Sequence, residues 1–228
     1  MKKRTVRLGT YDTATNGWTL AGCILTDPEP KTNYVERIGW DGAWDLSTVL
    51  SGGIPRYNNR TLTLSLENSQ GDRAAREKTI STMVNQLDGL EWQIILPDYP
   101  DHYLQGRVHI QVNYSDLAHA AVTITATCQP WLFKIRERVV VLNAPITAST
   151  DAATFLLRND GRRVVTPTLT VKGSASLSFN GNATSLSAGT YEWPALQLMP
   201  GDNEIRYLGA TGSTTDTLTI TYREAVLR

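Results

Sequence analysis

Three histidines are the side chains best suited to proton transfer in this chain of 228 residues: His102, His109 and His119. All three lie in or beside one long predicted β-hairpin. His109 alternates with apolar residues and therefore belongs to the polar face of its strand. Because a general base also needs a partner that positions it, we interpret His109 as a solvated surface residue rather than a catalytic one.

Paired carboxylates are a second candidate for chemistry, because two acidic side chains can together hydrolyse a glycosidic bond. Nothing in the sequence indicates that any pair faces a cleft. Aspartates in turns such as Pro97-Asp98-Tyr99-Pro100 usually accept hydrogen bonds from the turn backbone. The pairs are Asp41 with Asp45, Asp98 with Asp101, and Asp202 with Glu204.

Nucleophile and metal signatures are absent from the sequence. Cys23 and Cys128 lie far apart, with no Cys or His at ligand spacing, so we interpret both as ordinary core or strand residues. No Ser or Cys stands in a nucleophile elbow, and no glycine-rich run forms a phosphate-binding loop before a helix. The sequence therefore predicts a protein that is not an enzyme, with no catalytic residues, no cofactor and no metal.

Charge and hydropathy exclude two further classes of partner. The chain has 22 Lys and Arg against 22 Asp and Glu, so it lacks the basic field on which sequence-independent DNA binding depends. No apolar run approaches the ~20 residues of a membrane helix. Met1-Lys2-Lys3-Arg4 leads into mixed residues rather than a signal-peptide core. We expect a soluble protein that is made in a cytosol and has no membrane partner.

Apolar periodicity predicts a mainly β protein with two domains, 1–135 and 136–228, and a boundary near Arg136. In the first domain, alternating leucines from Arg60 to Glu67 indicate a half-buried strand. A helix is expected from about Asp72 to Leu87, packed on this sheet. Two long strands of a hairpin follow it, and Pro130 ends the domain. The apolar positions of the helix are Ile80, Met83, Val84 and Leu87, before a stop at Gly89.

The second domain shows short strands at regular intervals, which is typical of a β-sandwich. Asn159-Asp160-Gly161 and Asn180-Gly181 are signals for tight type I′ hairpins, because their residues tolerate positive φ. We expect residues 139–145 to bridge the two domains. The first strand of the sandwich is then expected to hold Phe155 and Leu157.

The segment 31–59, which we call the arm, combines many glycines with unusual apolar content for a loop. A long loop with little regular structure inside a compact domain is usually functional, and exposed aromatic residues suggest a partner surface. We expect the arm to bury part of this content on a neighbouring copy. The candidate interface residues are Ile38, Trp40, Trp44 and Tyr57. The simpler interpretation is that Trp40 and Trp44 fold back onto their own core.

Several motifs from about Arg60 onward resemble distal tail proteins of siphophages, the long-tailed, non-contractile bacteriophages. In the first domain they are Tyr103-Leu104-Gln105-Gly106-Arg107-Val108 and the strand that ends in Cys128-Gln129-Pro130-Trp131. In the second they are Leu157-Arg158-Asn159-Asp160-Gly161, Pro167-Thr168-Leu169-Thr170-Val171, Ser187-Ala188-Gly189-Thr190-Tyr191 and Pro200-Gly201-Asp202-Asn203-Glu204-Ile205.

This resemblance implies a homohexameric ring at the virion tail tip, made in the host bacterial cytoplasm. The first domains would surround the channel, and galectin-like β-sandwich domains would project outward. The partners implied are the tail tube protein, the tail-tip hub or tail-associated protein, and the tape-measure protein, with DNA only as cargo that passes through the channel. No carbohydrate-binding insertion is visible, in contrast to the longer members.

Two other functions fit the sequence. One is a lectin-like carbohydrate-binding module for host recognition, with Tyr191 and Trp193 as candidates for stacking on a sugar. The simpler interpretation of both residues is burial under a strand crossing. The other is a generic tail-tube or minor tail component, which differs only in its position along the tail.

Overall fold

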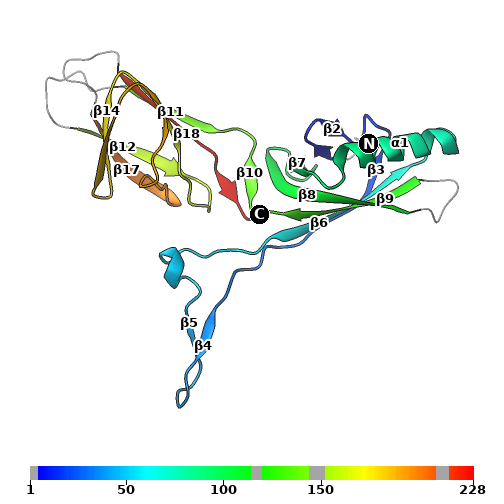
Figure 1. Ribbon diagram of the computed structural model, residues 1–228, viewed down its shortest axis with the longest axis horizontal. Helices are drawn as coiled ribbons and strands as arrows, with labels where there is room; N and C mark the ends of the chain where they lie inside the picture. The colour runs from blue at the N-terminus through cyan, green and yellow to red at the C-terminus, as the bar shows by residue number, and fades with distance from the viewer. Residues whose placement is uncertain (1–4, 114–119, 144–151, 209–215) are drawn as a thin grey trace. The chain divides into compact units, whose positions relative to one another are not determined.

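The computed structural model describes residues 5–113, 120–143, 152–208 and 216–228 (Figure 1). Antiparallel strands dominate this part of the chain, and α1 (Arg73–Leu87) is its one α-helix, so the prediction of a mainly β protein with one helix is confirmed. The chain divides into two compact units, Met1–Leu132 with Leu227, and Phe133–Val226 with Arg228. His119 lies outside the described residues, as do residues 114–118 between the two long strands of the predicted hairpin.

The first unit is built on one antiparallel sheet in the order β2-β1-β7-β8-β9-β6-β3. Its centre is the long pair β8–β9, and β6 pairs with β9 from Arg60 opposite Cys128 to Asn68 opposite Ala120. The strands are β1 (Arg7–Leu8), β2 (Tyr11–Asp12), β3 (Thr19–Leu25), β6 (Arg60–Asn68), β7 (Glu91–Ile95), β8 (His102–Asn113) and β9 (Ala120–Cys128).

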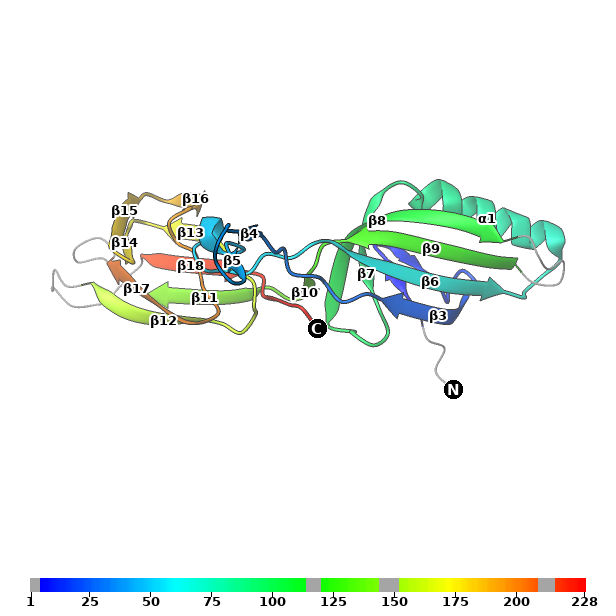
Figure 2. The ribbon, with the colours of Figure 1, turned by 90° about the horizontal axis from the view of Figure 1, so that it is seen from below.

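Helix α1 covers one face of this sheet, as Figures 1 and 2 show. Asp72 caps it, because its carboxylate accepts a hydrogen bond of 2.8 Å from the Ala75 amide. Ile80, Met83 and Leu87 are buried on the side that faces the sheet. The predicted helix is therefore confirmed at both ends and in its apolar stripe.

The arm continues the antiparallel pairing of β3 and β6 beyond the sheet. Backbone hydrogen bonds from Lys31 to Arg56 and from Asn58 to Glu29 hold its two sides together, at 2.7 and 2.8 Å. Its far end is a hairpin of β4 (Tyr34–Glu36) and β5 (Ala43–Asp45), followed by the 3₁₀ turn η1 (Val49–Ser51). Regular structure in the arm is limited to these short elements, and the cross-strand pairing joins its two sides.

The second unit is a β-sandwich of two four-stranded antiparallel sheets. Both sheets contribute to one apolar core, for example Leu169 and Ile220 from one and Ile205 and Tyr207 from the other. One sheet has the order β11 (Arg138–Asn143), β18 (Thr217–Tyr222), β13 (Thr168–Lys172) and β16 (Gly189–Glu192). The other has the order β12 (Ala153–Asn159), β17 (Gly201–Leu208), β14 (Ala175–Phe179) and β15 (Asn182–Leu186). The short strands β10 (Leu132–Lys134) and β19 (Ala225–Val226) pair with each other.

Of the two hairpin turns predicted in the second unit, one is confirmed and one is wrong. Asn180 and Gly181, with φ of 47° and 79°, form the two-residue turn between β14 and β15, as predicted. Asn159-Asp160-Gly161 does not form a hairpin, because β12 and the next strand β13 belong to different sheets. The Asn159 side chain is buried and donates to the carbonyls of Arg163 and Leu198, so it supports a crossover between the sheets.

The expected bridge at 139–145 was also wrong over residues 139–143, whereas residues 144 and 145 lie outside the described part of the chain. Residues 139–143 belong to strand β11, which pairs with β18 from Arg138 opposite Tyr222 to Asn143 opposite Thr217. The run Val139-Val140-Val141-Leu142 has no alternation by which the sequence could reveal a strand. Its side chains nevertheless alternate in the fold, with Val139 and Val141 exposed and Leu142 buried.

Candidate assembly surface

The exposed apolar side chains of this protein are concentrated on the arm. Seven of the fourteen large apolar side chains that are exposed among the described residues lie between Tyr34 and Leu50. They are Tyr34, Val35, Ile38, Trp40, Trp44, Val49 and Leu50, which we call the arm patch. Exposed apolar side chains that gather on one segment of a chain are typical of an interaction site. The arm is therefore the best candidate for a functional surface.

The hairpin at the end of the arm is held in its conformation by contacts within the single chain. The Arg37 guanidinium lies 4.8 Å from the ring centroid of Trp40 and 5.3 Å from that of Trp44, so one cation contacts both indoles. Asp45 accepts a hydrogen bond of 2.9 Å from the Ser47 amide. Hydrogen bonds from Ser47 hold the pKa of the Asp45 carboxyl below its ordinary value. These contacts fix the return of the chain after β5.

The structure separates the four candidate interface residues into two groups. Ile38 is fully exposed, and 63% of Trp40 and 53% of Trp44 remain exposed, so neither tryptophan folds back onto the core of its own chain. Tyr57 is half-buried at the base of the arm, where its ring meets Trp131 edge-on at 5.6 Å. Tyr34 and Val35 join the patch although the sequence did not single them out. Strand β4 has only three residues, all exposed, which is too short for a periodic signal.

His109 has a partner in Asp88, at the end of α1. Its Nδ1 lies 3.2 Å from Asp88 Oδ1, and the same carboxylate oxygen accepts a hydrogen bond from the Ile110 amide. Asp88 therefore joins the end of α1 to β8. His109 also borders a hollow of about 840 Å³ on the polar face of the sheet, lined by Gln111, Thr125 and other residues of β8 and β9.

Three of the other chemical candidates, Asp202, Glu204 and Cys128, have surroundings that explain them structurally. Asp202 and Glu204 on β17 lie 3.7 and 3.6 Å from Arg158 and Arg206, so exposed ion pairs account for both carboxylates. Burial raises the pKa of the Cys128 thiol to about 12, which keeps it protonated and unreactive. No three of the described His, Cys, Asp and Glu residues gather in a way that could hold a metal ion. Within the same part of the chain, no helix is long and apolar enough to cross a membrane.

Tyr191 and Trp193, the candidates for sugar stacking, lie at the side of the sandwich formed by β16. Both are half-buried and pack against the core of the second unit. Tyr191 is opposite Leu169 of β13, and its hydroxyl lies 3.2 Å from Ser187 Oγ. Much of each ring is therefore already used within the chain.

The fold class of this protein is defined by two parts. A helix-covered antiparallel sheet with an apolar arm comes first, and an antiparallel sandwich follows it. No protein-family model matches its sequence, and neither does any curated protein. Among solved structures, the crystal structure of SPP1 Dit (gp 19.1) matches with a TM-score of 0.68. The match covers 97% of this chain and 99% of that one at 14% identity, and it confirms at the level of the fold the resemblance predicted from the sequence.

SPP1 Dit is described as a paradigm of the hub adsorption apparatus in phages that infect Gram-positive bacteria. A de novo designed double-stranded β-helix also matches, over 39% of this chain and 99% of that one at 19% identity. Its TM-score of 0.26 is too low to inform the fold or the function.

Proposed function

We propose that this protein is a structural component of a bacteriophage tail tip. In this role it is a distal tail protein whose copies form a homohexameric ring around the DNA channel and join the tail tube to the tail-tip hub. The observation that carries the proposal is the Dit fold, which extends over both units and 97% of the chain.

The arm patch supports the self-association that a ring requires. Fully exposed side chains such as Ile38 and Leu50 are costly in water, and a neighbouring copy is the partner that every ring subunit has. The formal net charge of zero also suits the wall of a conduit, because DNA would pass without being held by counterion release. The partners are other copies of this chain, the tail tube protein, the hub or tail-associated protein and the tape-measure protein.

The second unit acts as an outward galectin-like scaffold in this proposal. The alternative is that it binds host carbohydrate through Tyr191 and Trp193. Their packing against the core leaves less of each ring available for stacking on a sugar, which favours the scaffold. DNA is cargo only, and the protein acts in the virion after synthesis in the host cytoplasm.

The solution mass of the purified protein tests the ring. Light scattering is expected to give about six times the 25.2 kDa of a single chain. A monomer at all concentrations would contradict the proposal. The assembled ring should then be tested on host cell-wall glycans. Saturable binding that Trp193→Ala abolishes, with the ring intact, would replace the scaffold with the carbohydrate-binding alternative.

A further inference from the structure

The second unit is joined to the first by two stretches of chain rather than one. The chain enters the unit at Phe133 and leaves it after Val226. We call residues 133–138 the incoming segment and residues 223–226 the outgoing segment. They are hydrogen-bonded to each other, since β10 pairs with β19 and the Lys134 amide donates to the Glu224 carbonyl at 3.0 Å. The side chains that hold these two segments to each other and to the sandwich all belong to the second unit.

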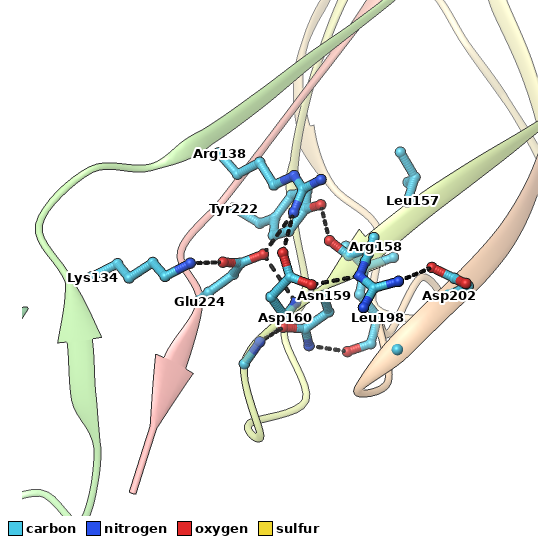
Figure 3. Close-up of polar contacts among 12 residues, drawn as sticks. Lys134, Arg138, Leu157, Arg158, Asn159, Asp160, Leu198, Asp202, Tyr222 and Glu224 are labelled. Carbon is cyan, nitrogen blue, oxygen red and sulfur yellow. Dashed lines mark hydrogen bonds and ion pairs between the residues drawn. The ribbon is translucent and has the colours of Figure 1, made fainter. Parts of the chain in front are cut away.

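Glu224, in the outgoing segment, has a side chain that is only 3% exposed, and its carboxylate collects three donors (Figure 3). Lys134 Nζ donates to Oε2 at 2.5 Å, and an Arg138 Nη donates to Oε1 at 3.1 Å. The backbone amide of Asp160 donates to the same Oε1 at 3.1 Å. Lys134 and Arg138 belong to the incoming segment, and Asp160 belongs to the crossover between β12 and β13. One carboxylate therefore joins three parts of the chain.

Further contacts bring the same parts together. Arg223, the residue before Glu224, donates to the carbonyls of Lys134 and Ile135 at 2.7 and 2.5 Å. These hydrogen bonds also join the outgoing segment to the incoming one. Gly161 lies so close to the outgoing segment that a Cβ there would stand 2.7 Å from the Ala225 carbonyl oxygen. Glycine at this position allows the crossover to reach the backbone of Ala225.

We propose that Glu224 is the latch of a local hinge. When the latch is closed, both connecting segments are fixed to the crossover of the sandwich and move with it. When it opens, the two segments fray together while the sandwich stays folded, because Glu224, Lys134, Arg138 and Asp160 are not part of its apolar core. Hinges are formed by a few residues at the ends of elements, as here. The inference needs only a single copy and is independent of the proposed ring.

Hydrogen exchange measured by mass spectrometry tests the latch with the Glu224→Gln variant of the full chain. Whichever way the Gln amide turns, its N–H₂ meets either the Lys134 ammonium or the donors of Arg138 and Asp160, so donors face each other. We expect exchange in residues 133–138 and 223–226 to rise at least tenfold. Exchange in β13, β14 and β17 should stay within about twofold of the unmodified protein. The matched control is Glu204→Gln, which removes an exposed carboxylate 3.6 Å from Arg206 and should leave both segments unchanged.

Each outcome decides the proposal. Exchange that rises equally throughout the second unit would show that Glu224 only stabilises the sandwich, and no rise would show that it holds nothing; either result overturns the latch. If Glu224→Gln does not fold, Lys134→Met decides instead, because it leaves Arg138 and the Asp160 amide on the carboxylate. It should raise exchange in the same two segments by a smaller factor and speed tryptic cleavage after Arg136. Unchanged exchange in this variant would equally overturn the latch.

Discussion

Replacing Trp40 and Trp44 together by Ala distinguishes an assembly surface from a folding core. In the single copy these side chains are 63% and 53% exposed, and their ring contact is with Arg37. A cation–π contact at an exposed site contributes about 0.5–1 kcal/mol. The double variant should therefore lose less than about 2 kcal/mol of folding stability. For a chain of this size that corresponds to a shift in Tm of a few degrees.

The effect on assembly should be larger. A buried Trp removes about 150–250 Å² from water, and more than half of each side chain is still available in the single copy. At about 25 cal/mol per Å², covering the exposed parts is worth about 4–7 kcal/mol for the pair. Because area converts incompletely into affinity, we expect about 3 kcal/mol, or more than 100-fold in the dissociation constant of each contact.

Sedimentation velocity over a concentration series, with a thermal melt of the same samples, measures both quantities. The matched control is Trp193→Ala, which removes a Trp that is half-buried on the core of the second unit. It should lower Tm and leave the mass of the assembly unchanged. The reasoning is refuted if the double variant of Trp40 and Trp44 fails to fold, or if it assembles as tightly as the unmodified protein.

Three further predictions concern the second unit and the two thiols. Burial raises the pKa of Glu224, but hydrogen bonds from Lys134, Asp160 and Arg138 outweigh it and leave the pKa below the ordinary 4.5. The stability that this carboxylate contributes is therefore complete above pH 4.5 and lost as pH falls through the folded pKa, so the difference in Tm between the unmodified protein and Glu224→Gln should shrink in acid. Gly181→Val puts a β-branched residue at a φ of 79° and should cost about 1–2 kcal/mol in urea unfolding; an unchanged midpoint would contradict the positive-φ turn. Iodoacetamide at pH 8 should label half-buried Cys23 well before Cys128, whose pKa is about 12, and peptide mapping of equal labelling would contradict that assignment.

Sequence reasoning succeeded where a signal is local. The stripe Ile80, Met83 and Leu87 with the Asp72 cap gives helix α1, and Asn180-Gly181 gives the turn between β14 and β15. It failed where the structure depends on distant partners. Strand β11 is defined by pairing with β18, about 80 residues further along the chain, and a run of apolar residues cannot reveal such a partner. Asn159 was interpreted as a turn residue because its buried acceptors, including the Leu198 carbonyl, are equally remote.

The arm shows the same limit at the level of a functional surface. Composition was enough to single out the segment, because aromatic residues among glycines are unusual in a loop. It could not separate Tyr57 from Trp40 and Trp44, since all three are aromatic residues in the same irregular stretch. The difference lies in Trp131, which meets Tyr57 from the end of the first unit and makes it an anchor of the arm rather than part of its free surface. An aromatic residue is therefore available for assembly only where no distant ring already covers it. The tip of the arm meets that condition, because among the described residues Arg37 is the one ring partner of both tryptophans.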